Sequence, residues 1–99
     1  MRIDILYVPD CAHLERARAH VREALDAAGV EATVRGIEVA TAEAAATAGM
    51  RGSPTVLIDG HDPFAVPSVP TSLSCRLYPE DGRTDGAPSV AQLIEAVAR

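Results

Sequence analysis

The first part of the chain places a cysteine at the junction of a strand and a helix. An apolar run over residues 2–8, rich in Ile and Val, ends at a Pro-Asp pair and predicts a buried strand. Apolar residues at every third or fourth position then predict a helix over residues 11–28. Asp10 is expected as its N-cap and Gly29 as a left-handed C-cap. A strand followed at once by such a helix favours an α/β fold, in which helices pack on a sheet.

Cys11 falls in the first turn of this predicted helix. The positive end of the helix dipole favours a thiolate over a thiol there, and the thiolate is the nucleophilic form. Asp10 acts in the opposite sense, because a neighbouring carboxylate disfavours a second negative charge. The alternative is a small, buried, unreactive cysteine, which is the usual fate of a free cysteine.

The rest of the chain continues the alternation of strands and helices. A glycine in the second strand, Gly36, suggests a bulge. The expected elements, in chain order, are a strand over 31–39, an Ala-rich helix over 42–48 between Thr41 and Gly49, a strand over 55–58, a proline-bearing loop over 61–73, a strand over 74–78, and a helix over 90–98 that opens with a Ser89–Gln92 capping box.

The resulting order is β-α-β-α-β-β-α. A strand, helix and strand of these lengths imply a parallel pair joined by a right-handed crossover. The last two strands and the last helix would complete a central sheet covered on both faces.

Composition narrows the class of protein. The 99 residues suffice for one domain, residues 1–99. A net charge of −5 with 3% aromatic residues argues against a nucleic-acid partner. No signal-peptide core or membrane-length apolar run is present, so we expect a cytoplasmic protein with no membrane partner. We also expect no cofactor. Two cysteines in a cytosolic chain are more often reduced, catalytic or metal-binding than a structural disulfide.

Two motifs carry a resemblance to a known family. One is the turn Cys11-Ala12-His13-Leu14, and the other is Ser53-Pro54-Thr55 before the third strand. With the order of elements, they make the chain resemble the thioredoxin-like superfamily over essentially its whole length. The resemblance implies a central mixed four-stranded sheet flanked by helices.

The family's proline before the third strand is cis and faces the active cysteine, which here implies Pro54 opposite Cys11. The Ser53 backbone would then pair with an extended thiol substrate, and Ser53, Pro54 and Thr55 would form the substrate-binding segment. The alternative is a proline that only opens an edge strand.

One residue departs from the family pattern. Leu14 occupies the position of the second cysteine of the dithiol turn, so no local disulfide can form. A mixed disulfide on Cys11 would instead be resolved by an external low-molecular-weight thiol or by Cys75. Cys75 would be inert if it pointed into the core from the middle of a strand.

His13 occupies the third position of the turn. In dithiol oxidases of this superfamily with a Cys-Pro-His-Cys turn, the histidine stabilises the thiolate, and the resemblance implies the same role for His13. The alternative is a solvated residue in the first helical turn. His20 is expected to be exposed.

Two further groups of residues have open roles. His61, with Asp59 and Asp62, forms only a weak candidate for a metal site, because the spacing is irregular. Tyr7 and Phe64 would either shield the thiol or belong to the core.

The resulting prediction is thiol–disulfide exchange, with Cys11 as nucleophile, His13 and Cys75 in support, and a protein or low-molecular-weight thiol or disulfide as partner. Whether the protein acts as an oxidoreductase enzyme stays open. One alternative is a thiol protein that binds a soft metal or metalloid such as mercury. Another is a binding module that keeps the fold without catalysis. The oligomeric state stays open.

Overall fold

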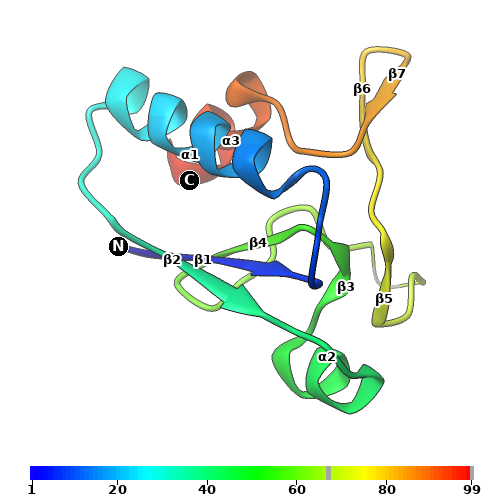
Figure 1. The fold of residues 1–99 in the computed structure, drawn as a ribbon. Helices are drawn as coiled ribbons and strands as arrows, with labels where there is room; N and C mark the ends of the chain where they lie inside the picture. Colours follow the sequence, from blue (N-terminus) through cyan, green and yellow to red (C-terminus); the bar gives the residue numbers. More distant parts are fainter. Residues whose placement is uncertain (67, 99) are drawn as a thin grey trace.

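In the computed structural model, residues 1–66 and 68–98 are described, and they form a mixed α/β structure (Figure 1). Residue 67, within the predicted loop, lies outside the described residues. The elements, in chain order, are β1 Arg2–Tyr7, α1 Leu14–Ala28, β2 Thr33–Glu38, α2 Ala42–Ala48, β3 Arg51–Ser53, β4 Thr55–Ile58, β5 Ser72–Cys75, β6 Tyr78–Glu80, β7 Arg83–Asp85 and α3 Val90–Ala98.

The central sheet has the order β2-β1-β4, with β1 parallel to β2 and antiparallel to β4. Figure 1 shows α1 and α3 together over one face of this sheet and α2 on the other. Both faces of β1 are therefore buried, which explains its nearly continuous apolar run. The core under α1 and α3 consists of Ile3, Ile5, Val21, Ala24, Leu25, Val56, Leu93 and Val97, and the smaller core under α2 consists of Leu6, Val39, Ala45 and Met50.

Several predicted elements are confirmed. β4, α2 and α3 lie where the sequence placed them. The Thr41 hydroxyl accepts the Ala44 amide at the start of α2, and the Ser89–Gln92 capping box opens α3. Gly29 closes α1 in the left-handed conformation, with φ of 66°. The sequence predicts these caps because each capping residue forms its hydrogen bonds with backbone groups only a few positions away.

The predicted start of α1 is wrong by three residues. The helix begins at Leu14, and His13 occupies the cap position without a side-chain capping bond. Two turns precede the helix, in which the Cys11 amide donates to the Val8 carbonyl at 3.2 Å and the Leu14 amide donates to the Cys11 carbonyl at 3.4 Å. Asp10 is exposed with φ of 58°, so it is not the N-cap. Cys11 thus lies before the first helical turn, to which the helix field is confined.

The predicted bulge at Gly36 is also wrong. The register between β1 and β2 runs unbroken from Arg2–Thr33 to Tyr7–Glu38. Val34 packs against the core under α1 and Ile37 packs against the core under α2, so a regular strand with two covered faces explains the apolar pattern. Gly36 instead allows close approach, because a Cβ there would lie 3.2 Å from the Tyr7 ring.

The predicted four-stranded central sheet is not observed. Among the described residues the central sheet has three strands, and the segment predicted as one strand over 74–78 is divided between two others. β5 pairs in parallel with β3, and β6 pairs with β7 in an antiparallel hairpin. Arg76 lies between β5 and β6, and its guanidinium donates to the Asp62 carboxylate and to the Phe64 carbonyl. The predicted strand is interrupted at this residue.

None of the helices in the described part of the chain combines the length and apolarity needed to cross a membrane.

Candidate thiol site

Cys11 is held by a short chain of hydrogen bonds that reaches back to β1. The Val8 amide donates to the Ser53 hydroxyl at 3.1 Å, and that hydroxyl donates to the Cys11 sulfur at 3.1 Å. A serine hydroxyl has one proton, so accepting from Val8 leaves it free to donate to sulfur. Ser53 is only 3% exposed, while Cys11 is half-buried. The sulfur therefore has a fixed donor on one side and partial access to solvent.

The peptide bond between Ser53 and Pro54 is cis, as the resemblance predicted. It follows β3 directly and precedes β4, so the turn at Ser53 is anchored by strands on both sides. The hydrogen bond from Ser53 brings Cys11 against this segment. The predicted proximity of Cys11 to the Ser53–Pro54 peptide is thus confirmed.

The backbone of Ser53 already has a partner within the chain. Its carbonyl accepts the Arg76 amide at 3.1 Å, and Ser53 is in register with Cys75 in the β3–β5 pair. β5 approaches so closely because residue 52 is glycine: a Cβ on Gly52 would lie 2.9 Å from the Arg76 Cβ. The Ser53 carbonyl belongs to the backbone that we expected to pair with an extended substrate, and it is already occupied by the amide of the residue that follows β5.

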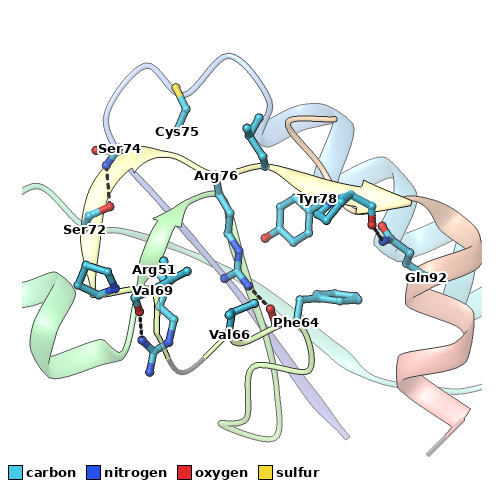
Figure 2. Close-up of a pocket in the computed structure, with 13 residues that line it drawn as sticks. Arg51, Phe64, Val66, Val69, Ser72, Ser74, Cys75, Arg76, Tyr78 and Gln92 are labelled. Carbon is cyan, nitrogen blue, oxygen red and sulfur yellow. Dashed lines mark hydrogen bonds between the residues drawn. The ribbon is translucent and has the colours of Figure 1, made fainter. Parts of the chain in front are cut away.

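Cys75 is exposed and has a free thiol, so it is not the inert core residue that the sequence left open. Residues in register on neighbouring strands project from the same face of a sheet. Because the Ser53 side chain faces Cys11, we expect the Cys75 side chain to project toward the same face. Figure 2 shows the Cys75 sulfur pointing away from the Arg76 guanidinium. Cys11 and Cys75 thus both neighbour Ser53.

A buried polar network lies on the opposite side of β5. The Arg76 guanidinium donates to both carboxylate oxygens of Asp62, at 2.7 and 3.3 Å, and to the Phe64 carbonyl at 2.9 Å. It also donates to the Thr55 hydroxyl at 3.1 Å. The Arg76 and Asp62 side chains are each 8% exposed. This network ties the loop after β4 to the segment that carries Cys75.

Tyr78 joins the network to the cis peptide. Its hydroxyl donates to the Pro54 carbonyl, and the Arg76 guanidinium lies 4.9 Å from its ring centre. Burial raises the pKa of the Tyr78 phenol, so it is a neutral donor at physiological pH. Phe64 packs edge-on against this ring, with 5.5 Å between the two ring centres. The sequence did not reveal these roles, because no local pattern links Tyr78 to Pro54.

The remaining predicted site residues are placed as follows. His13 packs against the chain before α3, because a Cβ on Gly86 would collide with the His13 ring. Its role toward the thiolate stays a prediction. His20 is half-buried rather than exposed, with Nδ1 2.8 Å from the Pro88 carbonyl oxygen. Thr55 is fully buried and donates to the Gly52 carbonyl at 2.6 Å, so it supports the segment rather than facing solvent.

The weak metal candidate at His61 does not assemble. Asp62 is committed to Arg76, and Asp59 accepts the Arg2 amide at 2.7 Å. Over residues 1–66 and 68–98, no three His, Cys, Asp or Glu side chains gather as a metal site. Tyr7 and Phe64 are both half-buried, and Phe64 packs against the core under α1 and α3.

A groove of about 660 Å³ runs along β5. We call it the β5 groove, and Figure 2 shows the side chains around it. It is lined by Arg51, Phe64, Val66, Val69, Cys75, Leu77 and Tyr78, among others.

No protein-family model, curated protein or solved structure matches this chain. The resemblance to the thioredoxin-like superfamily therefore depends on the motifs and geometry of the chain itself.

Proposed function

We propose that this chain is a thioredoxin-like thiol–disulfide exchange protein with Cys11 as its nucleophile. The observation that carries the proposal is the hydrogen bond from the Ser53 hydroxyl to the Cys11 sulfur. A donated hydrogen bond is stronger to a charged acceptor than to a neutral one, so the Ser53 hydroxyl can stabilise negative charge on the Cys11 sulfur when that sulfur attacks or leaves. Partial exposure of Cys11 allows a substrate to reach it.

The reaction begins when the Cys11 thiolate attacks one sulfur of a substrate disulfide. A bond forms between Cys11 and that sulfur, and the other half of the substrate leaves as a thiolate. Cys75 then attacks the Cys11 sulfur, which forms the Cys11–Cys75 disulfide and releases the second thiolate. The substrate gains two electrons and the protein loses them. Two equivalents of an external low-molecular-weight thiol then reduce the Cys11–Cys75 disulfide and leave joined as their own disulfide, which restores both protein thiols.

The placement of β5 supports a small substrate. An extended peptide needs a free backbone edge beside the nucleophile, and the Ser53 carbonyl already accepts the Arg76 amide. A low-molecular-weight disulfide needs only access to the sulfur. The position of Cys75 beside Ser53 supports its role as the resolving thiol.

Turnover of a small disulfide, hydroxyethyl disulfide, in the presence of excess reduced glutathione tests the proposal. We expect Cys11→Ser to abolish turnover, and Ser53→Ala to slow alkylation of Cys11 by iodoacetamide about tenfold, because it removes the donor to the thiolate. Cys75→Ser should retain the first step, and in the absence of glutathione it should accumulate a mixed disulfide on Cys11, which mass spectrometry detects. Equal turnover by wild type and Cys11→Ser would overturn the proposal.

A further inference from the structure

We propose that the β5 groove is a binding site for a small organic anion with an apolar body, such as a medium-chain or aromatic carboxylate. This goes beyond thiol–disulfide exchange, because the proposed reaction uses none of the lining residues of the groove except Cys75, and binding of the anion does not involve that thiol. Two independent properties of the groove, its apolar walls and its charge, define the ligand.

The walls gather apolar side chains that the protein leaves in solvent. In the described part of the chain, four large apolar residues are exposed, and three of them line this groove: Val66 at 51%, Val69 at 42% and Leu77 at 64%. Phe64 and Tyr78 add aromatic surface beside them. Scattered exposed apolar residues are ordinary, but their concentration in one concave surface is typical of a binding site.

The charge of the groove is positive, although the chain carries a net charge of −5. Its charged lining residues are Arg51 and Arg76, and among residues 1–66 and 68–98 no carboxylate lines it. Asp62 neutralises the charge of Arg76, since the two side chains form a buried ion pair. The Arg51 guanidinium donates to the Val69 carbonyl, and it forms no ion pair with any carboxylate of residues 1–66 and 68–98. One uncompensated cation at the side of an apolar groove complements an apolar body with one negative group.

The size of the groove favours a small molecule over a protein surface. Its volume of about 660 Å³ falls within the range of about 300–1,000 Å³ that is typical of small-molecule sites. In Figure 2 Arg51 and Val69 lie together on one side, and Val66 and Phe64 lie farther along. A carboxylate at Arg51 would therefore leave its apolar body against Val66 and Phe64.

Displacement of a fluorescent probe, anilinonaphthalene sulfonate, from the folded protein tests the site. Octanoate and octylamine serve as competitors because they share one apolar chain and carry opposite charges. We expect octanoate to displace the probe at concentrations about tenfold lower than octylamine. Equal potency of the two competitors, or no saturable binding of the probe by folded protein, would overturn the proposal.

Variants of the groove separate its two properties. Arg51→Gln should reduce the preference for octanoate about fivefold or more, whereas Arg51→Lys should retain most of it. Val66→Ser, which removes apolar surface from the part of the groove that would hold the apolar body, should weaken both competitors equally. Arg22→Gln on the exposed side of α1 is the matched control and should change neither competitor. An unchanged preference in Arg51→Gln, with folding verified by circular dichroism, would show that Arg51 does not select the ligand.

The test uses neither cysteine. Loss of thiol exchange in Cys11→Ser, with binding of octanoate intact, would leave this proposal standing, and the reverse result would leave the proposed function standing.

Discussion

The central sheet and residues 72–80, which we call the β5 segment and which run from β5 through β6, are stabilised in different ways. The sheet β2-β1-β4 encloses apolar side chains such as Ile5 and Val56, which are completely buried under α1 and α3. The β5 segment is instead anchored by the Arg76 and Asp62 ion pair and by the hydroxyl of Tyr78. Apolar packing is non-directional, whereas hydrogen bonds fix positions. The sheet therefore supplies stability, and the polar network sets where β5 and Cys75 lie.

This difference predicts different responses to mutation. Apolar cores tolerate swaps that keep volume, at less than about 1.5 kcal/mol. When one member of a buried polar network is removed, its former partners stay buried without a hydrogen bond. Each such unpaired group destabilises the folded state.

The largest effect is expected from Arg76→Ala. It leaves the Asp62 carboxylate buried without its cation, and breaking such a pair costs roughly 3–5 kcal/mol. It also removes the donor to the Phe64 carbonyl. We expect the free energy of unfolding in urea to fall by about this amount.

The double variant Arg76→Met with Asp62→Leu is the control. It removes both charges while keeping apolar volume, so most of the lost stability should return. If Arg76→Ala unfolds the chain, the double variant still tests the prediction. A folded double variant with most of the wild-type stability supports the role of the ion pair, and an unfolded one contradicts it.

An intermediate effect is expected from Gly52→Ala, which separates β5 from β3. Gly52 has φ of 106°, and the new Cβ would lie 3.1 Å from the Ser74 carbonyl oxygen and 3.2 Å from the Arg76 Cα. Backbone strain and displacement of β5 together should cost about 2–3 kcal/mol. Formation of the Cys11–Cys75 disulfide should also slow, because Cys75 moves with β5.

Gly49→Ala is the matched comparison in urea denaturation. Gly49 also has a left-handed φ, of 75°, but a Cβ there meets no atom within 4 Å. It should cost only the conformational penalty of about 1 kcal/mol and leave disulfide formation unchanged. Equal losses in the two variants would show that the contact between β3 and β5 contributes nothing.

The same division explains what the sequence could predict. β4, α2 and α3 were located because apolar periodicity and caps are local signals. The cis Ser53–Pro54 bond and its proximity to Cys11 followed from the resemblance. These features depend on residues next to one another or on the order of elements.

The β5 segment could not be predicted in the same way. The Arg76 and Asp62 pair joins residues 14 positions apart across an irregular loop, and neither residue belongs to a periodic pattern. Residues 74–78 were predicted as one strand of the central sheet. The bonds of Arg76 to Asp62 and to the Phe64 carbonyl fall between β5 and β6, where the predicted strand is divided. The donor role of the Ser53 hydroxyl was missed for a related reason, since it requires the turn after β1 to place Cys11 away from the helix.

The smallest effect is expected at Asp4, the polar exception within the central sheet. Asp4 is 4% exposed, and it accepts from Arg35 at 2.9 Å and from Arg2 at 3.2 Å. The hydrogen bond from Arg35 is the main cause that holds the pKa of Asp4 below its ordinary value. Both arginine side chains are 54% exposed, so solvent weakens the pairing. We expect Asp4→Asn to cost about 1 kcal/mol at neutral pH.

The pH dependence gives this prediction its sign. Because the pKa of Asp4 is lower in the folded state, the unfolded state binds more protons as the pH falls below about 4, the ordinary carboxyl value. The stabilisation is complete above that pH and is lost as the pH falls through the lowered value. The difference between wild type and Asp4→Asn in urea should therefore shrink from pH 7 to pH 3, while Glu23→Gln on exposed α1 should show no such change. A constant difference would mean that packing around residue 4, rather than its charge, stabilises this part of the sheet, and the contrast with the β5 segment would then be sharper still.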